Sequence, residues 1–102
     1  MTPNGSHAAP SPELESLRAR IGEIDAQILT LALARTEVIG KIAAEKERLS
    51  LPVRDDERER AHVAVLLDEA RGRGAGNREA SFVREVFEGI FEASRRLQSR
   101  QR

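Results

Sequence analysis

Arg35 and Lys46 are the residues whose type and spacing first suggest chemistry. They stand 11 positions apart, and in an α-helix that spacing returns to within about 20° of the same direction, about 16 Å further along the axis. Both cations would therefore face one groove, with room between them for a small molecule that carries two negative groups. Arg35 and Glu45 interrupt an apolar pattern, and a buried charge must be paired or solvated. For Arg35 alone, a salt bridge that sets helix register is the alternative explanation.

Further polar residues fall on common helix faces later in the chain. Asp55, Arg58 and Glu59 lie at positions i, i+3 and i+4 and share one face, which by itself is typical of a solvated salt-bridge surface. Ser94 and Gln98 continue an apolar stripe at helical spacing, so the core-facing side of that helix ends in two neutral hydrogen-bonding groups. Buried hydroxyl and amide groups need partners, which makes this pair unusual for a core.

A long first helix is expected to carry Arg35 and Lys46. Ser11, Pro12 and Glu13 form a helix-start signal, with a serine cap, a proline at the first position and an acid in the first turn. Apolar residues then recur every three or four positions, a period of about 3.5 that is typical of a coiled-coil seam. The seam consists of Leu14, Leu17, Ile21, Ile24, Ile28, Leu31, Val38, Ile42 and Leu49.

This helix is expected to need a partner. About 35 residues would extend roughly 50 Å, whereas a compact domain of this chain length is about 25–35 Å across. The rest of the chain cannot cover such a seam, so we infer a homodimer with intertwined helices. Arg18 lies 17 positions before Arg35, about 26 Å away along the helix. Arg18 could therefore reach the same site only from the partner protomer.

Two shorter helices are expected to complete an all-α chain of three helices. Asp55 and Asp56 place acids at the start of the second helix, which runs to about Ala70. The glycine-rich segment 72–77 then ends it, and Asn77 is expected to cap the third helix. No strand precedes the glycines and no Gly-Lys-Ser/Thr follows them, which favours a turn over a phosphate-binding loop. The predicted apolar stripes are Val63, Leu66, Leu67 and Ala70 on the second helix, and Phe82, Val83, Val86, Phe87, Ile90, Phe91 and Leu97 on the third.

Composition and charge exclude several classes of function. The 102 residues carry 17 basic and 17 acidic side chains, so the chain has no net positive charge that would attract nucleic acid. Its three phenylalanines, with no tryptophan or tyrosine, offer little aromatic surface for stacking on bases. No apolar run is long enough to span a membrane, and the absence of cysteine excludes disulfides and thiolate chemistry. His7 and His62 have no co-ligands at metal spacing, so neither a metal nor a cofactor is expected.

The ends of the chain are expected to be accessory. We expect residues 1–12 to be a disordered leader and residues 13–102 to form one domain. The leader has neither the apolar core of a signal peptide nor the arginine-rich pattern of a transit peptide, which favours a cytoplasmic location. A basic tail is most simply explained as a solvated helix end whose cations complement the helix dipole. The tail comprises Arg95, Arg96, Arg100 and Arg102.

Three segments carry a family resemblance, which extends from about Leu14 to Gln98. They are LRARIGEIDAQILTLALAR with the glutamate and two lysines that follow it, PVRDDERE, and FEASRRLQ. Together they resemble the all-helical (AroQ-class) chorismate mutases. Members of that family are intertwined homodimers in which each long first helix spans both protomers, so the resemblance implies the same assembly here. The positions that match the family's site are Arg18 from the partner protomer, Arg35, Lys46, Asp55, Arg58, Glu59, Ser94 and Gln98.

The resemblance also implies a substrate and a reaction. Chorismate, a dicarboxylate, would rearrange to prephenate in the biosynthesis of phenylalanine and tyrosine, through a concerted [3,3] shift that needs no nucleophile, general base or metal. Lys46 and Gln98 would donate hydrogen bonds to the ether oxygen as its bond breaks. A neutral amide donates at any pH, so activity is expected to persist to alkaline pH.

The remaining roles implied by the resemblance concern binding of the substrate. Guanidinium groups suit bidentate pairing with carboxylates. Arg18 and Arg35 would bind the two carboxylates, and Arg58 and Ser94 would orient them. Glu59 would hold the ring hydroxyl, and Asp55 would help to position that end of the substrate.

Two other interpretations stay open at this stage. Isochorismate-pyruvate lyases and 4-amino-4-deoxychorismate mutases resemble this fold but depart from the pattern at residues 53–59, which is intact here. A non-enzymatic helical dimerisation module would explain the seam and the charged faces, but not Arg35, Lys46, Ser94 and Gln98 together. Nothing in the sequence identifies a regulatory partner enzyme of the aromatic pathway.

Overall fold

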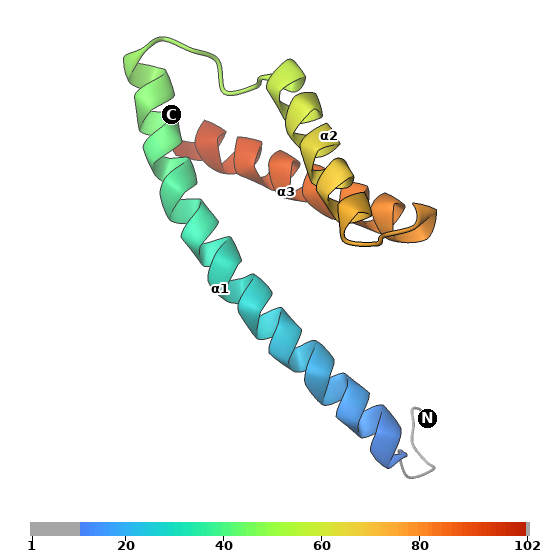
Figure 1. Cartoon of the computed structure of the whole chain (residues 1–102). Helices are drawn as coiled ribbons and strands as arrows, with labels where there is room; N and C mark the ends of the chain where they lie inside the picture. The colour runs from blue at the N-terminus through green and yellow to red at the C-terminus, as the bar shows by residue number, and fades with distance from the viewer. Residues whose placement is uncertain (1–10, 102) are drawn as a thin grey trace, which may run out of the picture. The chain divides into compact units, whose positions relative to one another are not determined.

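A computed structural model describes residues 11–101, and all the regular structure in this range is helical. The helices are α1 (Pro12–Arg48), α2 (Asp56–Gly72) and α3 (Asn77–Gln101), as Figure 1 shows. The predicted all-α class with three helices is therefore confirmed for the described part of the chain. The chain divides after Arg35 into a first unit, described over residues 11–35, and a second unit, described over 36–101. Helix α1 contributes to both units.

Helix α1 begins where its sequence signal predicts. The Ser11 hydroxyl accepts a hydrogen bond from the backbone N–H of Leu14 at 2.9 Å, and the Ser11 carbonyl accepts one from the N–H of Glu15 at 3.0 Å. This N-cap satisfies backbone donors that the first helical turn cannot satisfy internally. The predicted leader was wrong in its last two positions, because Ser11 and Pro12 form the helix start. Its first ten residues lie outside the described part of the chain.

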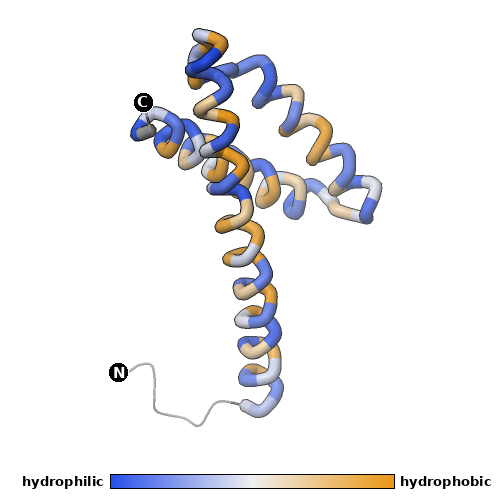
Figure 2. The backbone as a smooth tube through the Cα atoms, turned by 90° about the vertical axis from the view of Figure 1, so that its left-hand side faces the viewer, coloured by the Kyte–Doolittle hydropathy of each residue, from blue (hydrophilic) through white to orange (hydrophobic). Residues whose placement is uncertain are grey.

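The first unit is a single helical segment whose apolar seam is exposed. Its six predicted seam residues have exposed fractions between 41%, at Leu14, and 67%, at Leu31. Leu29 and Leu33 are exposed as well, although they lie outside the predicted seam. Figure 2 shows apolar segments recurring along this helix. Local backbone hydrogen bonds and the cap therefore define this segment, while its apolar side chains stay exposed in the described part of the chain.

Within the second unit, α1 buries a different face from the one predicted. Ile39 and Ala43 are buried, whereas the seam residues Val38 and Ile42 remain exposed. Adjacent residues differ by about 100° around a helix, so the buried face is rotated from the seam. The end of α1 therefore has one apolar face buried in the chain and a second that stays open.

Helices α2 and α3 pack against each other around the main core. The core consists of Val63 and Leu67 from α2 and Ala80 and Phe91 from α3. The stripe predicted on α2 is confirmed for Val63 and Leu67, which are buried, and for Leu66, which packs against them, while Ala70 is only half-buried. Partly buried residues complete the cluster: Leu66, Val83, Phe87 and Ile90.

The stripe predicted on α3 was only partly correct. Phe82 and Val86 are exposed, at 69% and 41%, while Ala80 is buried although the prediction omitted it. The buried face follows positions 80, 83, 87 and 91, and residues one position away point about 100° from it. Phe82 and Val86 therefore lie beside the face that α2 covers.

The turn after α2 is a Schellman motif. The N–H of Ala75 donates to the carbonyl of Ala70 at 3.0 Å, and the N–H of Gly74 donates to that of Arg71 at 2.9 Å. Gly74 has φ +97°, the left-handed conformation that this motif requires and that glycine adopts without a Cβ penalty. The predicted turn is confirmed, with α2 ending at Gly72 rather than at Ala70.

The start of α3 differs from the prediction by one residue. Asn77 is the first helical residue, and Gly76 occupies the cap position because its carbonyl accepts the N–H of Ala80 at 2.9 Å. The prediction that Asn77 caps the helix was therefore wrong. The Glu79 carboxylate accepts the Gly76 N–H at 3.0 Å, so a side chain in the first turn does the capping from inside the helix.

Candidate active site

The predicted site residues fall in both units. Arg18 and Arg35 belong to the first unit, and the other six belong to the second. Arg18 is well exposed, and its guanidinium lies 3.7 Å from the carboxylate of Glu15, one turn earlier on α1. Arg35 is half-buried. These two arginines are therefore described apart from the rest of the predicted set.

Lys46 anchors the segment that connects α1 to α2. Its ammonium group donates a hydrogen bond of 2.8 Å to the carbonyl of Val53, and the contact is partly buried. An ammonium group carries three N–H donors, so this bond does not exhaust it. Lys46 is thus fixed beside the connecting segment with donor capacity for an oxygen atom of a ligand.

Asp55 caps helix α2, and this local structure fixes the following turn. Its carboxylate accepts the backbone N–H of Arg58 at 3.1 Å, and its carbonyl accepts the N–H of Glu59 at 3.1 Å. Asp55 and Arg58 are exposed, whereas Glu59 is half-buried on the face that packs toward α3. The Asp55 carboxylate is therefore occupied by the helix cap. The Glu59 carboxylate, one turn later, lies between α2 and α3.

Glu59 forms an ion pair with Arg95 on α3, 36 positions later. Its Oε1 atom accepts from a terminal nitrogen of the guanidinium, and the two side chains are 27% and 21% exposed. Arg95 is therefore not part of a solvated tail, and that prediction was wrong for this residue. A signal was available, because Phe87, Phe91 and Arg95 are spaced four apart and so share the face of α3 that meets α2.

Ser94 and Gln98 lie one turn apart toward the end of α3. The Ser94 hydroxyl donates to the carbonyl of Ile90 at 2.8 Å, a bond within its own helix. Gln98 is 5% exposed, and its Oε1 atom accepts no hydrogen bond from the residues that the structure describes. A buried amide oxygen without a donor is unfavourable by about 1–3 kcal/mol. Among the described residues, the Gln98 amide oxygen therefore has an unused capacity to accept a hydrogen bond.

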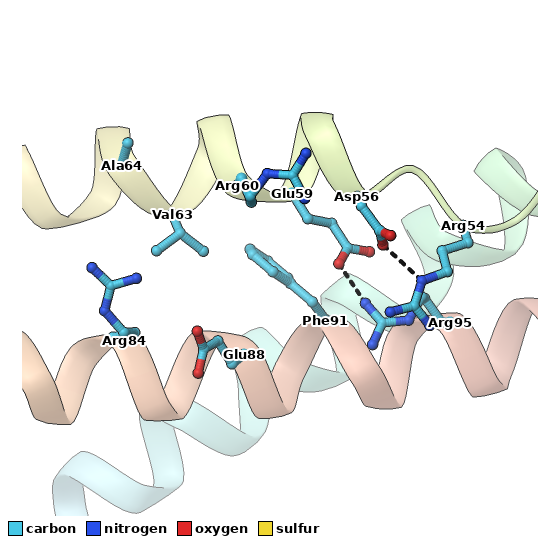
Figure 3. A pocket seen from close by; sticks show the side chains of 10 residues that line it. All are labelled: Arg54, Asp56, Glu59, Arg60, Val63, Ala64, Arg84, Glu88, Phe91 and Arg95. Atoms are coloured by element: carbon cyan, nitrogen blue, oxygen red, sulfur yellow. Dashed lines mark hydrogen bonds and ion pairs between the residues drawn. The ribbon is translucent and has the colours of Figure 1, made fainter.

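A cavity of about 450 Å³ lies between α2 and α3. Figure 3 shows Val63 and Phe91 forming its apolar part while Glu59 and Arg95 approach each other from opposite helices. Of the predicted site residues, Glu59 lines this cavity and the other five of the second unit do not. Its full lining is Arg54, Asp56, Glu59, Arg60, Val63, Ala64, Arg84, Glu88, Phe91 and Arg95.

The connecting segment brings Lys46 close to the same part of α3. Val53, which accepts the Lys46 hydrogen bond, lines a second cavity of about 530 Å³ together with Arg95 and Ser99. Arg54 lines both cavities and is held by Asp56 at 2.7 Å. The start of α2 and the end of α3 thus bring several guanidinium groups together in the second unit. Asp56, Glu59 and Glu92 pair with three of them, Arg54, Arg95 and Arg96.

Glu45, the other charge predicted to interrupt the seam, is paired on its own helix. Arg48 donates from its Nε to the Glu45 carboxylate at 3.2 Å. This hydrogen bond lowers the pKa of Glu45 below its ordinary value of 4.5 and raises the pKa of Arg48. Both groups are exposed, so the expectation that a seam charge is paired or solvated is met at Glu45.

The described residues offer neither a membrane span nor an acidic metal cluster. Over residues 11–101, no helix has the length and apolarity needed to cross a bilayer. In the same range, no three side chains of His, Cys, Asp or Glu gather in a group that could hold a metal ion. The charged groups of the site are arginine, lysine and carboxylates, and the carboxylates of Asp56 and Glu59 pair with arginines.

Over residues 11–101 the regular structure is all helical, and the site region combines arginine, lysine and carboxylate side chains with a buried amide. The sequence model of the chorismate mutase type II family matches residues 17–99. This match covers most of the chain, so the protein belongs to the chorismate mutase type II family. A comparison with curated proteins gave no significant match.

Proposed function

We propose that this protein is a chorismate mutase that converts chorismate to prephenate. The observation that carries the proposal is the family match over residues 17–99. It is supported by the residue types at the positions predicted for the site, which include cations for two carboxylates and a buried amide. The pathway to phenylalanine and tyrosine follows from the same proposal.

The proposed reaction suits a site built from charges and hydrogen-bond donors. The rearrangement is concerted, so catalysis consists of holding the substrate in its compact conformer and stabilising charge on the ether oxygen as its bond breaks. Lys46 and Gln98 are the proposed donors to that oxygen. The partly buried ammonium of Lys46 and the 5% exposure of Gln98 support this role, because a donor removed from water interacts more strongly with developing charge.

Substrate binding is proposed to use residues of both units. Arg35 and the Arg18 of a second protomer would bind the two carboxylates through guanidinium forks. The Glu59 carboxylate would accept a hydrogen bond from the ring hydroxyl of the substrate. Asp55 would position that end of the substrate by fixing the first turn of α2, and Arg58 and Ser94 would orient the carboxylates.

A homodimer forms part of this proposal. The seam of the first unit is exposed in the single chain, including Leu17 at 49% and Ile28 at 58%. A contiguous apolar surface of this kind is typical of an interface between subunits. A second copy of α1 would cover the seam and would supply Arg18, whose distance from Arg35 along one helix prevents both from meeting in a single protomer.

Product analysis tests the proposed function directly. The purified full chain is incubated with chorismate and, separately, with isochorismate, and the products are identified by NMR. We expect prephenate from chorismate at a rate far above the uncatalysed background. Pyruvate release from isochorismate as the dominant reaction would instead indicate the lyase. No turnover of either substrate would leave 4-amino-4-deoxychorismate and a non-catalytic dimer as the remaining candidates.

The Lys46→Ala variant tests the proposed donor to the ether oxygen. Loss of one preorganised donor costs about 2.7–4 kcal/mol of transition-state stabilisation, so kcat is expected to fall by about a hundredfold to a thousandfold. Lys41→Ala is the matched control, because Lys41 lies on the same helix and is exposed. Normal turnover by Lys46→Ala would remove Lys46 from the proposed machinery.

The Gln98→Glu variant tests the position of the amide through its pH dependence. The wild-type rate is expected to persist to alkaline pH, since the amide donates in every protonation state. A glutamic acid at this buried position would donate only while protonated. We therefore expect kcat/KM of Gln98→Glu to decline as pH rises while the wild type stays level. Parallel pH profiles would contradict the placement of Gln98 at the ether oxygen.

A further inference from the structure

Arg95 is a charged residue of α3 that lines the cavity and that the proposed mechanism does not use. Neighbouring ion pairs, such as Arg96 with Glu92 at 2.7 Å, join exposed residues one turn apart on a single helix. Such pairs contribute little, because water screens them. The pair of Arg95 with Glu59 differs, since it links two helices across 36 positions and both side chains are largely withdrawn from solvent.

The pair is built into the wall of the cavity between α2 and α3. Both side chains line this space of about 450 Å³, beside the buried ring of Phe91. Figure 3 shows the Glu59 carboxylate directed at the Arg95 guanidinium. The apolar part of the cavity lowers the local dielectric and strengthens the attraction between the two groups. The Glu59 carboxylate is thus held by a partner from the opposite helix.

We propose that Arg95 is a positioning residue that holds the Glu59 carboxylate ready for the substrate's ring hydroxyl. This inference rests on the proposed function. A carboxylate has two oxygen atoms, and the hydrogen bond from Arg95 goes to Oε1. Oε2, the second acceptor of the same carboxylate, would then accept the hydrogen bond of the hydroxyl. Arg95 acts through Glu59 and takes no part in the rearrangement itself.

Charge balance supplies a second reason for this arrangement. The proposed substrate carries two carboxylates, and an unpaired Glu59 would repel them in a partly buried site. The Arg95 cation offsets the charge of Glu59, so a carboxylate can serve as the hydroxyl acceptor without weakening anion binding. A neutral acceptor would avoid the repulsion but would form a weaker hydrogen bond.

The test is a double-mutant cycle on the full chain with chorismate as the substrate. Arg95→Met keeps much of the side-chain volume and removes the charge and the donors. Because hydrogen bonds to charged groups contribute about 1.5–3 kcal/mol, kcat/KM is expected to fall by about tenfold to a hundredfold. Glu59→Gln is expected to lower it as well. In the Glu59→Gln background, Arg95→Met should cause no further loss, since the group it positions is already altered.

Two further variants separate positioning from a general structural effect. Arg96→Met removes the neighbouring arginine, which is paired to Glu92 on the surface, and is expected to leave kcat/KM within about twofold of the wild type. Arg95→Lys retains the charge without the guanidinium fork and should restore part of the lost activity. Urea unfolding of the four proteins of the cycle measures the coupling between the two side chains independently of turnover.

Each outcome supports or overturns the inference. Non-additive losses in kcat/KM, with partial rescue by lysine, would support it. Independent losses in the double variant would overturn it and would indicate direct contact of Arg95 with the substrate. Equal activity of Arg95→Met and Arg96→Met, or a gain of activity, would overturn it as well. Coupling in the unfolding measurements without turnover by the wild type would show that the ion pair exists and that the proposed function has failed, and the inference with it.

Discussion

The two units of this chain obtain their helices in different ways. Residues 11–35 form a helix that has an N-cap, local hydrogen bonds and an exposed apolar seam. Within residues 36–101, α2 and α3 pack against each other around Val63, Leu67 and Phe91, and an ion pair joins the two helices. The apolar seam of the first unit is therefore exposed, whereas the second unit buries apolar residues between its own helices.

This difference shows that a helix can form without burial of its apolar face. A long helix of good formers with a cap satisfies its backbone whether or not its apolar side is buried. Most helical stability in proteins nevertheless comes from packing of the apolar face. The first unit should consequently depend on a partner chain, and the second unit should depend on contacts that are already present.

The largest effect is expected for Ile28→Asp, which places a carboxylate in the exposed seam of the first unit. In the proposed dimer this charge would be buried without a partner, at a cost of several kcal/mol, so the dimer should weaken by more than about a hundredfold. Sedimentation velocity measures the change, and chorismate turnover should be lost with the dimer. Thr30→Asp, on the polar side of the same helix, is the control that should remain dimeric. Equal behaviour of the two variants would contradict the proposed interface.

A smaller effect is expected for Leu67→Ala in the core of the second unit. Leu67 is 4% exposed, and truncation of a buried leucine costs about 2–5 kcal/mol. Val65→Ala is the control on the same helix, because Val65 is exposed and its truncation should change stability by less than about 0.5 kcal/mol. Urea unfolding at one protein concentration compares them. Similar losses would indicate that a partner chain also covers the outer face of α2.

Two glycines at the end of α2 should respond in opposite directions. Gly74 has φ +97°, so Gly74→Ala should destabilise the chain by about 1–2 kcal/mol. Gly72 is helical, with open space around the position of an added Cβ, so Gly72→Ala should stabilise the chain by about 0.4–1 kcal/mol. Thermal unfolding distinguishes the two. A stabilising Gly74→Ala would show that the Schellman turn does not persist in solution.

The smallest effect is expected at the exposed pair of Glu45 and Arg48. The hydrogen bond lowers the pKa of Glu45 in the folded chain. Its contribution to stability is therefore present above the ordinary pKa of 4.5 and is lost as pH falls through the lowered value. Glu45→Gln should remove this small acid-dependent component from the urea midpoint. A variant whose acid dependence matches that of the wild type would indicate that the pair is open in solution.

The sequence determined the features that depend on local chemistry. Ser11 caps α1, glycines end α2, and the stripe of Val63 and Leu67 faces the core, because caps, turns and helical periodicity act over three to five residues. The residue pattern from Leu14 to Gln98 also led to the family, since that pattern combines residue types at defined helical positions.

Only the tertiary structure determined which side chains of different helices contact each other and which are buried. It paired Glu59 with Arg95, buried Ala80 while leaving Phe82 exposed, and enclosed Gln98. Helical periodicity places residues on a face, but the packing angle and register of the neighbouring helix determine which part of that face is covered. The spacing of Arg95 from Phe91 places it on the face of α3 that meets α2, but only the packed structure shows that Glu59 lies opposite it.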